Sequence, residues 1–155
     1  MGRVVFHIDV NSAYLSWESA WRLQHGETVD LREQIAVVGG NEEKRHGIVL
    51  AKSIPAKRLG VKTGESLFEA RQKAPGLIVV PPHYDLYMTC SGAMRQMLIE
   101  YSPAVQQFSI DEMFLEYTGA EGLYGPPLEA ADRMRERIKS ELGFTVNIGV
   151  SENKL

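Results

Sequence analysis

The chain of 155 residues has 44% hydrophobic and 24% charged residues and a net charge of −3, a composition typical of a globular protein with a sizeable core. No apolar run approaches the length of a membrane span, and the first residues, MGRVVFHID, lack the apolar stretch and cleavage site of a signal peptide. The single cysteine, Cys90, excludes an internal disulfide and a cysteine-based zinc site. We therefore expect a cytoplasmic protein without a membrane partner, stabilised by packing.

The charges are unevenly distributed along the chain. Residues 44–73 hold eight Lys and Arg against Glu65 and Glu69, a local balance of +6, so the remainder carries −9. The net charge argues against indiscriminate nucleic-acid binding, but a basic segment facing an acidic one suits a site where a polyanion and a divalent cation meet. A solvated surface with ordinary charge scatter is the alternative, and charge alone does not decide between the two.

The first half of the chain alternates short apolar runs with helix signals. Its predicted elements are a strand at 4–8 ended by Asp9, a helix capped by Asn11 or Ser12 that runs to about 24, strands at 34–38 and 47–51, and two short helices capped by Ser53 and Ser66, the second ending at 73. Pro75 and Gly76 close this part of the chain.

The second half predicts a strand at 77–80, a helix at 84–100, two strands within 105–117, a helix from Pro126 to 142 and a last strand at 144–150. With residues 12–76 set apart as an inserted α/β lobe, residues 1–11 and 77–155 read as an α+β domain. This pattern resembles a ferredoxin-like sheet with helices on one face.

Two adjacent carboxylates, Asp111 and Glu112, interrupt the β-like run FSIDEMFLEY at 108–117. Adjacent side chains of a strand point to opposite faces, so the two converge only where the chain turns, as at the end of a hairpin. Asp9 at the end of another strand could join them. Three such carboxylates suit Mg²⁺, which prefers oxygen ligands. An acidic turn and a strand-ending Asp that never meet remain the alternative, because spacing does not settle it.

Four motifs carry a family resemblance. HIDVNSAYLSWE at 7–18, EKRHGIVLAKSIPAKRLGVKTGE at 43–65, FSIDEMFLEYTG at 108–119 and TVNIGVSENKL at 145–155 together resemble the N-terminal catalytic part of Y-family, translesion DNA polymerases of the DinB/UmuC type. The resemblance implies that the ferredoxin-like domain is the palm and residues 12–76 are the fingers. It further implies that Asp9, Asp111 and Glu112 are catalytic and bind two Mg²⁺ ions, or Mn²⁺ as a substitute, with the Val10 carbonyl as a further ligand.

The resemblance also implies a nucleotide site. Backbone N–H groups of Ser12, Ala13 and Tyr14 are a predicted phosphate seat. Tyr14 matches the steric gate that excludes ribonucleotides, although a core aromatic is the ordinary interpretation of such a residue, and Lys154 matches the lysine that reaches the triphosphate. His7, Trp17 and Trp21 have no such counterpart, so we assign them to packing.

Two features depart from the family. Many relatives carry a T-x-x-Y-E-A-R arrangement in the fingers, where this chain has Ala51, Ile54 and Lys57. Lys57 keeps the charge but not the planar fork of arginine, so either Ser53, Lys52 or other groups compensate, or the nucleotide is held less tightly. The last residues, SENKL, place a capping serine after the final strand, which predicts a truncated palm that lacks the thumb and little finger.

We therefore expect the catalytic-core fragment of a template-directed, lesion-bypass DNA polymerase. Its partners would be primed template DNA and a deoxynucleoside triphosphate, with a sliding clamp recruited through the missing C-terminal part. A non-catalytic DNA- or protein-interaction module derived from a polymerase is the main alternative. A nucleotidyl cyclase-like palm is a weaker one, because the Gly-Gly-Asp/Glu-Glu-Phe hairpin of cyclases is absent.

Overall fold

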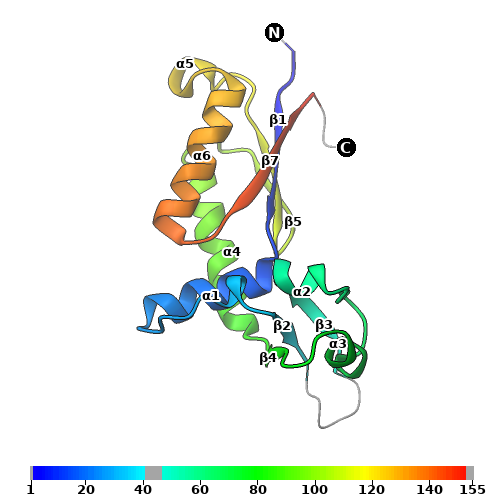
Figure 1. The fold of residues 1–155 in the computed structure, drawn as a ribbon. Coiled ribbons are helices and arrows are strands. Elements are labelled where there is room, and N and C mark those ends of the chain that lie inside the picture. Colours follow the sequence, from blue (N-terminus) through cyan, green and yellow to red (C-terminus); the bar gives the residue numbers. More distant parts are fainter. Residues whose placement is uncertain (1, 41–46, 153–155) are drawn as a thin grey trace. The chain divides into compact units, whose positions relative to one another are not determined.

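The computed structural model describes residues 2–40 and 47–152, and the chain divides into two compact units (Figure 1). Residues 1–11 and 87–155 form one unit, called the first unit below, and residues 12–86 form the second. The second boundary lies at Leu86, not at residue 76 as the sequence suggested. The reason is that the strand Ile78–Val80 pairs in parallel with Ala36–Val38 and so belongs to the sheet of the second unit.

The first unit is a four-stranded antiparallel sheet with the order β5-β6-β1-β7. Its elements follow the chain as strand, helix, strand, strand, helix, strand, which is the ferredoxin-like arrangement, and Figure 1 shows α4 and α6 on one side of the sheet. The predicted α+β fold is therefore confirmed. The elements of this unit are β1 (Val5–Val10), α4 (Tyr84–Ile99, which begins in the second unit), β5 (Val105–Ser109), β6 (Glu112–Glu116), α5 (Glu121–Tyr124), α6 (Pro127–Leu142) and β7 (Val146–Ser151).

The two faces of this sheet differ in burial. Along β6, Met113 and Leu115 are fully buried, whereas the alternate residues Glu112, Phe114 and Glu116 are partly exposed. Alternation of this kind is typical of an antiparallel sheet with one face packed against helices and the other open. Any side chain on the open face is therefore available to a ligand.

The second unit has a three-stranded sheet with the order β3-β2-β4, in which β2 pairs antiparallel with β3 and parallel with β4. Every residue of β2 is buried, because helices cover both faces of this sheet. The elements are α1 (Ala13–Gln24), the 3₁₀ helix η1 (Leu31–Glu33), β2 (Ala36–Gly39), β3 (Val49–Lys52), α2 (Ile54–Arg58), α3 (Leu67–Lys73) and β4 (Ile78–Val80).

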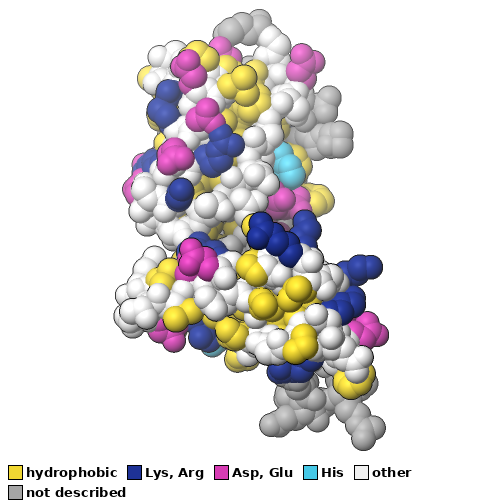
Figure 2. All heavy atoms as spheres, in the orientation of Figure 1, with side chains coloured by type: hydrophobic (Ala, Val, Ile, Leu, Met, Phe, Trp, Pro, Cys, Tyr) yellow, Lys and Arg dark blue, Asp and Glu magenta, His cyan; other side chains and the backbone are white. Residues whose placement is uncertain are grey.

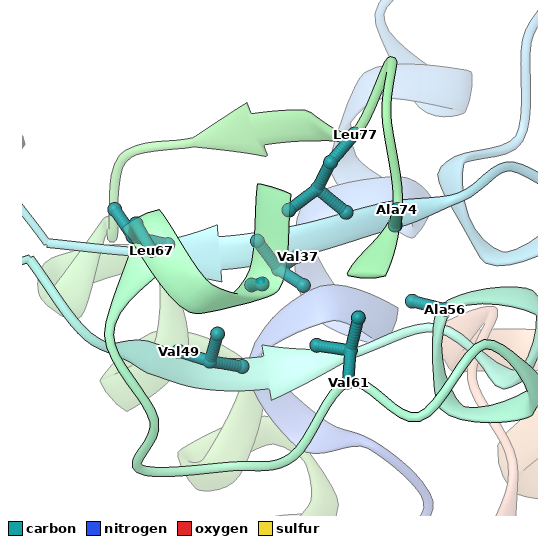
Figure 3. Close-up of a cluster of buried hydrophobic side chains, with 8 residues drawn as sticks. Val37, Val49, Ala56, Val61, Leu67, Ala74 and Leu77 are labelled. Atoms are coloured by element: carbon teal, nitrogen blue, oxygen red, sulfur yellow. The ribbon is translucent and has the colours of Figure 1, made fainter. Parts of the chain in front are cut away.

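Two apolar clusters lie on opposite faces of this sheet. Val37 and Val49 face Ala56 of α2 and Leu67 of α3 in the cluster of Figure 3, which also includes Val61, Ala70, Ala74 and Leu77. On the other face, Leu15 of α1 packs with Leu31, Ala36, Val38, Ala51 and Val80. The second unit thus has its own core and holds the start of α1 in place.

Several local predictions can be compared with the structure. The side chains of Ser53 and Ser66 accept hydrogen bonds from the backbone of Ala56 and Glu69, which confirms both predicted caps. The prediction for the first helix was wrong in detail, because Ser12 precedes α1 in the left-handed conformation (φ 45°) and its side chain makes no capping bond. Ser151, which was expected to follow the last strand, is the last residue of β7, and residues 153–155 lie outside the described part of the chain.

Candidate metal and nucleotide site

The backbone brings the three predicted metal-binding carboxylates together. Asp9 lies inside β1 rather than after it, and its Cα partner on β6 is Glu112. Partnered residues of antiparallel strands have Cα atoms about 4.5–5.5 Å apart and point to the same face. Asp111 occupies the turn between β5 and β6, and its carbonyl accepts a hydrogen bond from Val10 N–H at 2.9 Å. The hairpin therefore supplies the bend that two adjacent carboxylates need to serve one site.

Two of these carboxylates are held by neighbouring side chains. Ser109 Oγ donates to Asp111 Oδ1 at 2.9 Å, and His7 Nε2 lies 3.1 Å from Glu112 Oε2. Within residues 2–40 and 47–152, no group of three His, Cys, Asp or Glu side chains is already arranged to hold a metal ion. The backbone is in place for a shared site, and the carboxylates must converge further to form one.

The electrostatics of this end of the sheet show an excess of negative charge. Burial raises the pKa of Asp9, and the nearby Asp111 and Glu112 carboxylates raise it further, while His7 opposes them. Like charges disfavour the ionised form of a carboxyl group, so this cluster is unfavourable for the folded chain by itself. A divalent cation would remove the repulsion.

The residues present fit the Mg²⁺ ions that the resemblance implies. All three side chains offer carboxylate oxygens, the donor type that Mg²⁺ and Mn²⁺ prefer. The raised pKa of Asp9, caused partly by Asp111 and Glu112, indicates that the three groups share one electrostatic environment. Two acidic residues side by side on an open sheet face, with a third in the adjoining turn, therefore form a candidate divalent-metal site.

The predicted nucleotide residues of the second unit lie at the start of α1. Ser12 is exposed and Ala13 buried, and the ring of Tyr14 is half-buried beside the cluster around Leu15. This ring meets Tyr84 edge to face, with centroids 6.1 Å apart, and lies at 6.3 Å from Trp17. Tyr14 is therefore neither a fully buried core residue nor a freely exposed one.

The remaining fingers residues behave differently from one another. Ser53 is buried, and its hydroxyl donates to the Gln34 carbonyl at 2.6 Å and accepts from Ala36 N–H at 3.2 Å as well as from the capped helix. These bonds use the one donor and both acceptor sites of the hydroxyl. We therefore correct the assignment of Ser53: it stabilises the fold of the second unit and does not contact the nucleotide. Lys57 is exposed on α2 and remains available to an anion.

The basic segment is only partly described. Lys44 and Arg45, like Lys154, lie outside the described residues. Figure 2 shows Lys and Arg side chains beside a group of hydrophobic ones on the visible face of the second unit. Lys73 is paired with Glu65 at 2.7 Å, whereas Lys57, Arg58 and Lys62 are exposed. Part of the local positive charge therefore stabilises the fold and part faces solvent.

Two residues near the carboxylates were not recognised from the sequence. Ser109 was not singled out, and its position two residues before Asp111 was the only signal that the sequence offered for their hydrogen bond. His7 was assigned to packing, and its ring does stack on Phe114, but the ring also contacts Glu112, which was not foreseen. Its separation from Glu112 by 105 residues leaves no local signal, and only strand pairing reveals the contact.

The fold defines the class of the protein as α+β, with a ferredoxin-like unit that carries three acidic residues at one sheet end and a separate α/β unit, and the comparisons give its family. Residues 8–155 match the impB/mucB/samB family. The chain is 49% identical over 156 residues to DNA polymerase IV of Clostridium acetobutylicum, covering 100% of this chain and 39% of the relative. It is 44% identical to DNA polymerase IV of Acetivibrio thermocellus, covering 100% of this chain and 37% of the relative.

Solved structures give the same result. The insertion ternary complex of Dbh DNA polymerase superposes with a TM-score of 0.85 at 27% identity, covering 97% of this chain and 43% of that one. DinB from Sulfolobus solfataricus gives a TM-score of 0.82 at 25% identity, covering 97% and 42%. The chain belongs to the impB/mucB/samB family, and its resemblance to Y-family polymerases is confirmed.

The chain spans less than two fifths of the length of these curated relatives. The helices of the part that the structure describes are too short or too polar to cross a membrane.

Proposed function

We propose that the chain is the catalytic core of a template-directed DNA polymerase of the lesion-bypass type, which joins a deoxynucleotide to a primer 3′-hydroxyl and releases pyrophosphate. The observation that carries this proposal is the pairing of Asp9 with Glu112 beside the hairpin turn that holds Asp111, in a chain whose family relatives are named DNA polymerase IV. The first unit would be the palm and the second the fingers.

The carboxylates would act as metal ligands. Asp9, Asp111 and Glu112, with the Val10 carbonyl, would hold two Mg²⁺ or Mn²⁺ ions. Bound there, the ions would stabilise the attacking and leaving oxygens of the phosphoryl transfer. The chain's own part is to fix the ligand oxygens in place: β1 and β6 set the spacing of Asp9 and Glu112, and Ser109 orients Asp111 through its hydroxyl.

The second unit would bind the incoming deoxynucleoside triphosphate. The N–H groups of Ser12, Ala13 and Tyr14 lie at the start of a twelve-residue helix, where the helix dipole favours a phosphate. Lys57 would add positive charge, and Lys154 stays a predicted triphosphate ligand. Ala51 and Ile54 replace hydrogen-bonding residues of the usual family pattern, and the Ser53 hydroxyl is not available to compensate. We therefore propose that the nucleotide is held mainly by charge.

Tyr14 would be the steric gate against ribonucleotides. Its half-buried ring, held edge to face against Tyr84, is fixed enough to exclude a 2′-hydroxyl. Primed template DNA would be the second substrate. Recruitment by a sliding clamp, through parts of the polymerase outside this chain, stays a prediction, as does a cytoplasmic location, which suits the bacterial relatives.

Primer extension tests the proposal. We would join this chain to the part of the C. acetobutylicum DNA polymerase IV that lies outside the matched 156 residues, and supply primed template, deoxynucleotides and Mg²⁺. We expect extension, a fall on the order of 10³-fold or more in Asp111→Ala and Glu112→Ala, and little change in the control Glu116→Ala, which lies farther along the same strand. Binding of DNA without extension would instead favour the non-catalytic module.

A further inference from the structure

His7 lies on the open face of the sheet, on the same strand as Asp9 and two residues before it. It pairs across strands with Phe114, and Asp9 pairs with Glu112. Its Nε2 is 3.1 Å from Glu112 Oε2, and its ring stacks on Phe114 with centroids 4.9 Å apart and planes inclined by 22°. The imidazole is thus held by one stacking contact and one polar contact, both from β6.

The polar contact has a defined donor. An ionised carboxylate accepts hydrogen bonds and donates none, so the ring nitrogen facing Glu112 carries the proton. Both the Nε2–H neutral tautomer and the protonated imidazole satisfy this, so the arrangement does not depend on the charge of His7. Among residues 2–40 and 47–152, no hydrogen bond reaches the second oxygen of Glu112, Oε1.

We propose that His7 is a positioning residue for Glu112: it fixes Oε2 through its Nε2–H and thereby presents Oε1 as the metal-ligand atom. This inference rests on the proposed function, because it requires a divalent cation at the carboxylates. Hydrogen bonds from outer groups to ligating carboxylates orient them, and removal of such a partner typically weakens metal binding by about 10–100-fold.

Phe114 gives the ring its orientation. A half-exposed histidine on a strand would otherwise sample several rotamers, but the stacked Phe114 restricts the imidazole plane. Phe114 is in turn packed edge to face against Phe108, with centroids 5.9 Å apart. Phe108 therefore packs against Phe114, which stacks on the His7 ring that contacts Glu112 Oε2.

A purely structural role does not explain this pair. Both side chains are partly exposed, 41% for His7 and 33% for Glu112, and polar pairs that are exposed to this extent add little to stability. Arg3, which precedes β1, and Glu116 of β6 form a pair of similar length, 3.0 Å, at the end of the β1–β6 ladder away from Asp9. That pair serves as the matched control.

The test measures Mn²⁺ binding to the chain itself by electron paramagnetic resonance. His7→Phe keeps a ring for stacking but loses the donor, and we expect it to bind Mn²⁺ about 10–100-fold more weakly than the wild type. His7→Gln restores an N–H donor and should recover most of the affinity. Arg3→Gln should bind as the wild type does. Unchanged or tighter binding by His7→Phe, or no recovery in His7→Gln, would overturn the proposal.

A second readout needs no metal. Nitrogen-15 NMR of the His7 ring should show a proton on Nε2, and Glu112→Gln should shift that resonance while Glu116→Gln leaves it unchanged. A proton only on Nδ1 would refute the hydrogen bond directly. If the wild-type chain bound no Mn²⁺ while the NMR result held, the proposed function would fail together with the role of His7 toward a metal, although the contact itself would stand.

Discussion

The surroundings of the carboxylates differ between the two units: they raise the pKa of Asp9 in the first unit and lower the pKa of Glu65 in the second. The pKa of Asp9 is raised by burial and by two neighbouring carboxylates. The pKa of Glu65 is lowered by hydrogen bonds from Lys73 and from the Lys62 backbone. A carboxylate with donors around it stabilises structure, whereas one surrounded by other carboxylates is kept despite its cost, which indicates a function.

Glu18 extends the comparison. It is fully buried in α1, and His83 Nδ1 lies 2.5 Å from its Oε1, with Arg22 at 3.7 Å from its Oε2. The second unit thus gives even a buried acid a close histidine and a more distant arginine, although Glu18 Oε2 accepts no hydrogen bond from the described residues, whereas the carboxylates at the sheet end lie near one another. The following predictions test this contrast, from the largest effect to the smallest.

Removal of the partner of a buried acid should have the largest effect on stability. In His83→Ala, Glu18 Oε1 loses its 2.5 Å contact inside the fold, while Arg22 stays 3.7 Å from Oε2, so we expect the free energy of unfolding to fall by about 2 kcal/mol. Urea denaturation measures this. His25→Ala, a change at an exposed histidine just after the same helix, is the control and should stay within about 0.5 kcal/mol of the wild type. Equal effects of the two changes would contradict the assigned role of His83.

Glu65→Gln should cost about 1 kcal/mol, because it removes the charge that pairs with the partly exposed Lys73. The sign of the pH dependence follows from the lowered pKa. The contribution of Glu65 is present above its ordinary pKa and is lost as the pH falls through the lower, folded-state pKa. Denaturation of both proteins across this pH range should show the two stabilities converging in acid. A gap that persists at the lowest pH would exclude the ionic explanation.

Asp9→Asn should stabilise the fold, unlike the two changes above, although by a smaller amount. We expect it to raise the melting temperature of the metal-free chain at neutral pH. A carboxyl group whose folded-state pKa is raised destabilises the fold when it is ionised. The gain should therefore be complete above the folded-state pKa and disappear as the pH falls below the ordinary pKa of aspartate. Calorimetry with a chelator present measures it, and a lower melting temperature for Asp9→Asn at neutral pH would contradict the repulsion.

Much of this arrangement could be predicted from sequence where the signal is local. Ser53 and Ser66 were predicted as caps because each serine precedes a helical run, and each accepts a hydrogen bond from an N–H three residues ahead. The backbone proximity of Asp9, Asp111 and Glu112 agrees with the hairpin pattern, while their role as metal ligands came from the family resemblance and stays a prediction. The caps and the acidic pair were predicted from residue types within short stretches of the sequence.

Non-local contacts could not be predicted. Residues 77–86 were placed in the wrong unit because only the pairing of β4 with β2 assigns them. Ser53 was expected to meet a nucleotide, but its hydroxyl bonds to Gln34 and Ala36, 19 and 17 residues away. His7 was assigned to packing because the family offers no counterpart for it, and its contact with Glu112 could not be foreseen because that residue comes from a distant strand. In each case the deciding contact joins segments that no local pattern connects.

The central claim is that Asp9, Asp111 and Glu112 form one divalent-metal site. Substoichiometric Mn²⁺ broadens the NMR signals of nuclei near it, so amide spectra of the nitrogen-15-labelled chain locate the ion directly. We predict that the first signals to disappear are those of Asp9, Val10, Asp111 and Glu112, and that Asp111→Asn weakens the effect. Broadening centred elsewhere, or no selective broadening at these residues, would contradict the account.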